Sequence, residues 1–91
     1  MPANMKAAIA QYLLSLNKAK VLTHHAEDRA IYEKYLVDAA VILALVESEA
    51  SSHLIESAIQ MHERLWGHTW LSDDVYEELR TKWAAVKQCA V

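Results

Sequence analysis

Glycine and proline are almost absent from this chain, and their scarcity limits the possible folds more than any other feature. The single proline is residue 2, and the single glycine among 91 residues is Gly67. A β-sandwich or barrel needs turn residues every ~8–12 positions, and this sequence lacks them. Fifteen alanines act in the same direction, because alanine has the highest helix propensity. The sequence therefore predicts an all-α fold.

The length and composition predict one compact domain. A chain of 91 residues can bury one hydrophobic core but not two. With 54% hydrophobic and 23% charged residues it is too apolar to be disordered. We expect residues 1–91 to form a single four-helix bundle-like domain, with helices over about 4–22, 24–49, 53–66 and 73–89.

Capping residues set the expected helix boundaries. Thr23 precedes the second helix and Ser51 or Ser52 precedes the third, and hydroxyl side chains accept backbone N–H groups at helix starts. Gly67 is placed to end the third helix, because glycine adopts the left-handed conformation favoured just past a helix end. Ser72 is the expected cap of the fourth helix.

Apolar residues recur at helical spacing in all four segments and predict the faces that are buried. The expected core positions are Met5, Ile9, Tyr12, Leu13 and Leu16, then Ile31, Tyr32, Tyr35 and Leu36, then Leu54, Ile55, Ala58, Ile59, Met61, Leu65 and Trp66, and finally Val75, Leu79, Trp83 and Val86.

The second predicted helix contains an unusually apolar run. Between Leu36 and Val46, Asp38 is the only polar side chain in eleven residues. A helix that is apolar on all sides must be covered on all sides, which favours a homodimer. The expected dimer contacts are Leu36, Ala40, Leu43 and Ala44. The alternative is a monomer that leaves its alanines at the surface.

Asp38 within this run has two possible environments. Its charge is costly if it is surrounded by apolar side chains, and a buried carboxylate of this kind can take part in proton transfer. We expect instead that Asp38 faces solvent or pairs with Lys34 one turn earlier.

Aromatic side chains crowd around the predicted end of the third helix. Trp66, His68 and Trp70 flank Gly67, and tryptophan and arginine are enriched where proteins bind one another. The candidate partner- or ligand-binding residues are Trp66, His68, Trp70, His62, Tyr76 and Arg64. Three roles are possible for these side chains: packing in the core, contact with a protein partner, or lining a small-ligand pocket.

Motifs for catalysis and metal binding are missing from the sequence. There is no His-Glu-x-x-His, no Glu-x-x-His, no cysteine pair and no nucleophile elbow. We therefore expect no metal and no cofactor, and the sequence favours a non-catalytic protein over an enzyme.

Charge and cysteine content restrict the partners and the compartment. The net charge is −3, the wrong sign for a nucleic-acid-binding domain, although Lys6, Lys18 and Lys20 form a basic segment without acids. The lone Cys89 is typical of the reducing cytoplasm. No stretch reaches the ~20 apolar residues of a membrane span.

Taken together, these features predict a cytoplasmic protein–protein interaction module that acts as an adaptor, regulator or immunity-like factor. The module is expected to form a homodimer. One alternative is a ligand-binding or enzymatic bundle with its pocket between the third and fourth helices. A second is nucleic-acid binding through the lysines of the first helix.

Overall fold

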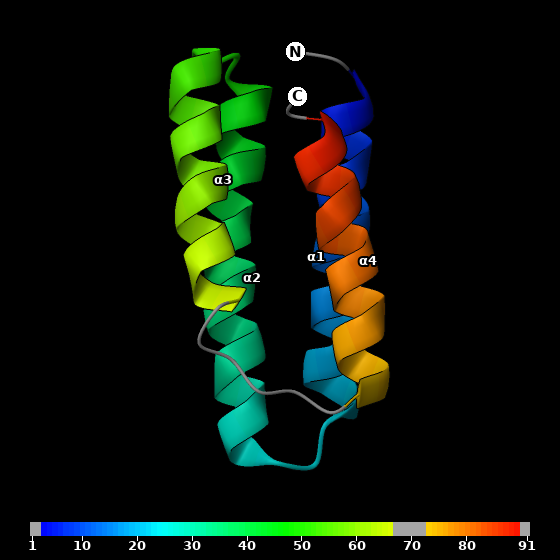
Figure 1. The fold of residues 1–91 in the computed structure, drawn as a ribbon. Coiled ribbons are helices and arrows are strands. Elements are labelled where there is room, and N and C mark those ends of the chain that lie inside the picture. Colours follow the sequence, from blue (N-terminus) through cyan, green and yellow to red (C-terminus); the bar gives the residue numbers. More distant parts are fainter. Residues whose placement is uncertain (1–2, 67–72, 90–91) are drawn as a thin grey trace.

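The computed structural model describes residues 3–66 and 73–89, and these residues form four α-helices (Figure 1). They are α1 (Ala3–Leu22), α2 (Ala26–Glu47), α3 (Ser52–Trp66) and α4 (Asp73–Cys89). The described part contains no strand. The all-α prediction is confirmed.

The helices form an elongated bundle of 38 × 19 × 19 Å. α1 packs against α2 and α4, and α2 packs against α3. In Figure 1, α3 and α4 lie in front of α2 and α1, and consecutive helices run in opposite directions. Among the described helices, none has a stretch long and apolar enough to cross a membrane.

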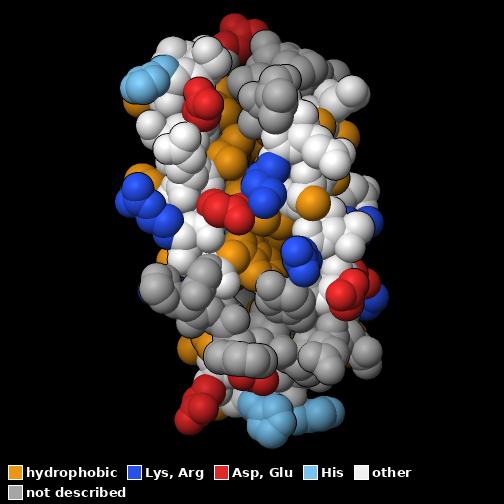
Figure 2. Space-filling model, in the orientation of Figure 1, with side chains coloured by type: hydrophobic (Ala, Val, Ile, Leu, Met, Phe, Trp, Pro, Cys, Tyr) orange, Lys and Arg blue, Asp and Glu red, His pale blue; other side chains and the backbone are white. Residues whose placement is uncertain are grey.

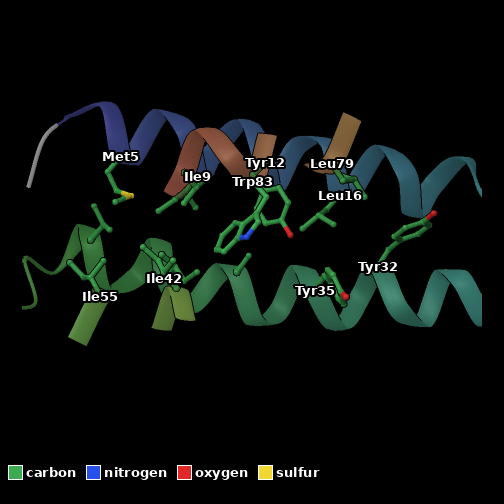
Figure 3. Close-up of a cluster of buried hydrophobic side chains, with 14 of the residues drawn as sticks. Met5, Ile9, Tyr12, Leu16, Tyr32, Tyr35, Ile42, Ile55, Leu79 and Trp83 are labelled. Carbon is green, nitrogen blue, oxygen red and sulfur yellow. The ribbon is translucent and has the colours of Figure 1, made fainter. Parts of the chain in front are cut away.

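One core fills the space between the helices (Figure 3). Its side chains from α1 and α2 come from positions spaced three and four residues apart, which places them on one face of each helix. The buried core residues are Met5, Ile9, Tyr12, Leu16, Ala19, Tyr32, Tyr35, Ala39, Ile42, Val46, Ile55, Ile59, Leu79, Trp83 and Val86.

The predicted buried face of α3 needs correction. Leu54 and Met61 are 54% and 62% exposed, whereas His62 is completely buried. Ile55, Ile59 and His62 are spaced four and three residues apart, so the histidine continues the stripe that faces the core. Hydrophobicity alone favoured Met61 over its neighbour.

α2 begins and ends within the predicted range of 24–49. Its N-cap is His25 rather than Thr23, and the His25 side chain makes no capping hydrogen bond. Thr23 lies two residues earlier, where its Oγ1 accepts a hydrogen bond from the His25 N–H at 3.3 Å. The hydroxyl therefore stabilises the turn between α1 and α2 rather than the first turn of α2.

The corner between α2 and α3 is a Schellman motif without glycine. The N–H of Ala50 donates to the Leu45 carbonyl at 3.0 Å, and the N–H of Glu49 donates to Val46 at 3.1 Å. Glu49 has a φ of 57°, the left-handed conformation that normally favours glycine. Ser51 then caps α3, since its Oγ accepts from the Leu54 N–H at 3.3 Å.

The remaining boundary predictions fall partly outside the described residues. Gly67 and Ser72 lie in the segment 67–72, which the structure does not describe, and the side chain of Val75 is likewise outside it. The end of α3 at Trp66 and the start of α4 at Asp73 agree with the predicted ranges.

Candidate functional site

The corner predicted as a binding site is described in part. His62 is buried, Trp66 is half-buried and Arg64 is exposed. His68 and Trp70 lie outside the described residues, as does the side chain of Tyr76. The structure thus places His62 and Trp66 in a common cluster, which also contains residues that the sequence did not single out.

A chain of hydrogen bonds crosses the centre of the bundle. His62 Nε2 lies 2.6 Å from the hydroxyl of Tyr12 on α1, and His62 Nδ1 lies 2.7 Å from Oδ2 of Asp38 on α2. Trp66 Nε1 donates to the same Tyr12 hydroxyl at 3.1 Å. Three helices are therefore joined by polar side chains inside an apolar core.

The chemistry of the groups fixes the direction of these bonds. An indole N–H can only donate, so the Tyr12 oxygen accepts from Trp66. The Tyr12 O–H is then free to donate to Nε2 of a neutral His62. The proton of the neutral imidazole lies on Nδ1, and this N–H donates a hydrogen bond to the Asp38 carboxylate. Each member has a partner of the right kind, and no buried side-chain N or O of the described residues lacks one.

Burial keeps the central pair neutral. It lowers the pKa of His62 below 6.5, although the hydrogen bond to Asp38 acts in the opposite direction. Burial also raises the pKa of Tyr12 far above 10, against the effect of the Trp66 hydrogen bond. Both side chains are 0% exposed. An uncharged imidazole therefore sits between an uncharged phenol and the carboxylate of Asp38.

Aromatic rings enclose the imidazole. Tyr12 and Tyr35 meet it edge-on, each with ring centroids 5.4 Å away, and Trp83 lies 4.5 Å away in a tilted arrangement. The Tyr35 hydroxyl donates to the Leu65 carbonyl at 2.7 Å, which anchors the last turn of α3 to α2. Edge-to-face contacts of this kind stabilise a packed core.

Beside this cluster, a second polar group connects α3 to α4. The Nε1–H of Trp83 donates to Glu63, and Lys87 Nζ lies 3.2 Å from the same carboxylate. Burial raises the pKa of Glu63, but the hydrogen bonds from Trp83 and Lys87 outweigh it, so the net pKa is below 4.5. The carboxylate is therefore ionised at neutral pH.

The aspartate, histidine and tyrosine have the order of a proton-relay triad but not its accessibility. In a catalytic triad the nucleophile must be activated and reachable, whereas Tyr12 is enclosed and its pKa is raised. The Asp38 side chain, 38% exposed, is the member that meets the surface. The geometry favours a structural role for this cluster. The hydrogen-bond partner of Asp38 is His62. The sequence had suggested that Asp38 faces solvent or pairs with Lys34.

A shallow apolar groove lies on the other side of the molecule, between α1 and α2. It has a volume of about 620 Å³ and is lined by Ala10, Leu13, Leu14, Asn17, Leu36, Val37, Ala40 and Leu43. Three of the four predicted dimer contacts, Leu36, Ala40 and Leu43, line it. The fourth, Ala44, is exposed one turn after Ala40. α1 and α2 lie behind the other two helices in Figure 1, so this groove is not visible in Figure 2.

A smaller groove of about 390 Å³ lies between α2 and the end of α3. It is lined by Glu33, Lys34, Val37, Asp38, Val41 and Leu65. Val37 and Val41 are 66% and 51% exposed, so the outer side of α2 is apolar on both flanks.

The opposite face of the bundle differs in character. In Figure 2, acidic and basic side chains lie along α3 and α4, and hydrophobic atoms are visible in the seam between these helices. The ion pairs Glu63–Lys87 and Lys18–Glu78 hold α4 to its neighbours. Among the described residues, no group of three His, Cys, Asp or Glu side chains is arranged to hold a metal ion.

Sequence reasoning missed the roles of Tyr12 and Asp38 in the buried network. Their partners are 50 and 24 residues away in the chain, and helical spacing does not reveal which side chains of different helices meet. One signal was available, namely the position of His62 on the buried stripe of α3, since a buried imidazole needs hydrogen-bond partners.

Comparisons with known proteins give no relative from which a function could be transferred. No protein-family model matches the chain, and no curated protein or solved structure matches it either.

Proposed function

We propose that this protein is a non-catalytic protein–protein interaction module that self-associates through the groove between α1 and α2. The observation that carries this proposal is the groove itself, whose lining is aliphatic apart from Asn17. Small-ligand sites combine apolar walls with a few convergent polar groups, and the lining of this groove offers one amide.

The exposure of large apolar side chains supports a macromolecular partner. Leu14 and Val37, on either side of the groove, are 62% and 66% exposed. The core of α1 is formed by residues such as Ile9, Tyr12 and Leu16, and helical spacing places Leu14 on the opposite side of the helix. Contiguous exposed apolar surface of this kind marks interaction sites.

The spacing of small residues supports a helical partner. Val37, Ala40 and Ala44 follow one another at intervals of three and four on α2, as do Ala7, Ala10 and Leu14 on α1. All six are exposed. Such a 3–4 pattern forms the seam of packed helices, and alanine allows the helix axes to approach closely. A second copy of the chain presents this pattern on its own α1 and α2.

The test compares one leucine and one methionine whose side chains are equally exposed. Leu14 in the groove and Met61 on α3 are both 62% exposed, so neither L14E nor M61E disturbs the core. We expect the unchanged chain and M61E to be dimers by sedimentation equilibrium, and L14E to be a monomer with the same helix content. A monomeric unchanged chain at ~100 µM, or a dimer that L14E leaves intact, would refute the proposal.

A further inference from the structure

We infer that two copies pair groove to groove about a two-fold axis parallel to the helices, so that α1 of each copy lies against α2 of the other. This inference rests on the proposed self-association and specifies its geometry. It is carried by the charged residues at the two ends of the groove.

On α1, lysines lie at both ends of the groove. Lys6 and Lys20 are each seven residues from Leu13, which lines the groove. Seven residues are nearly two helical turns, so both lysines lie on the same face of α1 as this leucine. The N-terminal 24 residues contain no acidic side chain.

On α2, glutamates occupy the corresponding positions. Glu33 and Glu47 are each seven residues from Ala40, which lines the opposite wall of the groove. α1 and α2 are antiparallel (Figure 1), so Lys6 and Glu47 lie at one end and Lys20 and Glu33 at the other. None of these four side chains forms an ion pair with another residue of the described part.

Two symmetric arrangements can bring the grooves of two copies face to face. A two-fold axis across the helices places α1 against α1 and α2 against α2 of the partner. An axis along the helices exchanges the sides and places α1 against α2. Both give isologous contacts, so the apolar lining does not distinguish them.

The charges do distinguish these arrangements. With the axis across the helices, Lys6 would meet the partner's Lys20, and Glu33 would meet the partner's Glu47. With the axis along the helices, Lys6 meets the partner's Glu47, and Lys20 meets the partner's Glu33. Opposite charges at an interface fix its register, whereas like charges disfavour it. Both arrangements make facing helices antiparallel, as in helix bundles, so the choice between them rests on the charges.

Charge reversal provides the first test. The K6E/K20E variant should raise the dimer dissociation constant about tenfold, because attractive pairs become repulsive at four places in the symmetric dimer. Adding E33K and E47K should restore it. The matched control is K18E, since Lys18 lies beside Glu78 of α4 at 3.4 Å, away from the groove, and should leave the constant unchanged. With the axis across the helices, K6E/K20E would leave the dissociation constant unchanged instead.

Disulfide trapping between different copies provides the second test, in a C89S background that removes the native thiol. Copies carrying A10C should cross-link to copies carrying A44C, because these exposed alanines lie on facing helices at the same end of the groove. Mixed A10C and N17C copies should not cross-link.

The two tests separate failure of the geometry from failure of the dimer. Cross-linking of A10C to N17C, with a dissociation constant insensitive to K6E/K20E, would overturn the inferred axis while leaving self-association intact. A chain that is monomeric throughout would overturn self-association itself and the axis with it.

Discussion

Nδ1 of His62 lies 2.7 Å from Oδ2 of Asp38, and this contact joins α3 to α2 at the edge of the core. The imidazole is completely enclosed, while the aspartate side chain is 38% exposed. The carboxylate can thus keep part of its hydration while it accepts a hydrogen bond from inside the bundle. This arrangement avoids the large cost of burying a whole carboxylate.

Removing the Tyr12 hydroxyl should destabilise the fold. Y12F removes the hydroxyl that the Trp66 N–H and His62 Nε2 share, and an unsatisfied nitrogen on the completely buried His62 costs about 1–3 kcal/mol. We expect a loss of about 1–3 kcal/mol in the free energy of unfolding, measured by urea denaturation. Y32F is the control, because Tyr32 also packs in the core but its hydroxyl is not part of the hydrogen-bonded chain. Equal effects of the two substitutions would contradict the network.

The stability should decrease as the pH falls below about 6.5. Burial lowers the pKa of His62 from 6.5, so the folded state favours the neutral imidazole and the unfolded state takes up a proton first. The stabilising contribution is complete above pH 6.5 and decreases below it, until the folded-state pKa is reached. Urea titrations between pH 7.5 and 5 should show this slope in the unchanged chain and in H53Q, at an exposed site. A slope that H62Q leaves intact would assign the effect to another group.

Truncating Glu63 should cost more than truncating its lysine partner. E63A leaves the N–H of the buried Trp83 without an acceptor, at a cost of about 1–2 kcal/mol. K87A removes a half-exposed ion pair, worth less than about 1 kcal/mol. E63Q retains an acceptor and should lie between them. Thermal unfolding monitored by circular dichroism ranks the three variants, and an equal loss in E63A and K87A would contradict the proposed role of Trp83.

Replacing Glu49 should stabilise the chain. Its φ of 57° places a β-carbon in the left-handed region, which costs a non-glycine residue about 1 kcal/mol. E49G removes this strain and should raise the free energy of unfolding by about 0.5–1 kcal/mol. E49A retains the β-carbon and serves as the control. If both variants gain equally, the gain comes from loss of the charge rather than from the backbone.

Much of the fold could be predicted from local patterns. The four helices follow from apolar residues spaced three and four apart, and Ser51 is the cap that its position suggested. The corner at Glu49 was harder to predict, because the helix ends without the glycine that usually marks such a stop. Thr23 showed the opposite problem, since a suitable capping residue lies two positions before the actual cap.

The polar network could not be predicted, because it depends on contacts between distant segments. Met61 is more hydrophobic than His62, yet the histidine faces the core. Its burial is favourable only because Tyr12 and Asp38 supply hydrogen bonds from two other helices. A pattern within one helix contains no information about those partners.

The hydrogen-bonded chain from Trp66 through Tyr12 and His62 to Asp38 also fixes the register of the helices, that is, their positions relative to one another along the bundle axis. Aliphatic faces with 3–4 spacing look similar after a slide of two turns, so they define longitudinal position weakly. A slide of even one turn would move His62 about 5.4 Å past Tyr12 and break every polar contact at once. These four side chains therefore set the register of α1, α2 and α3. In this register Leu13 and Ala40 lie on the two walls of one continuous groove.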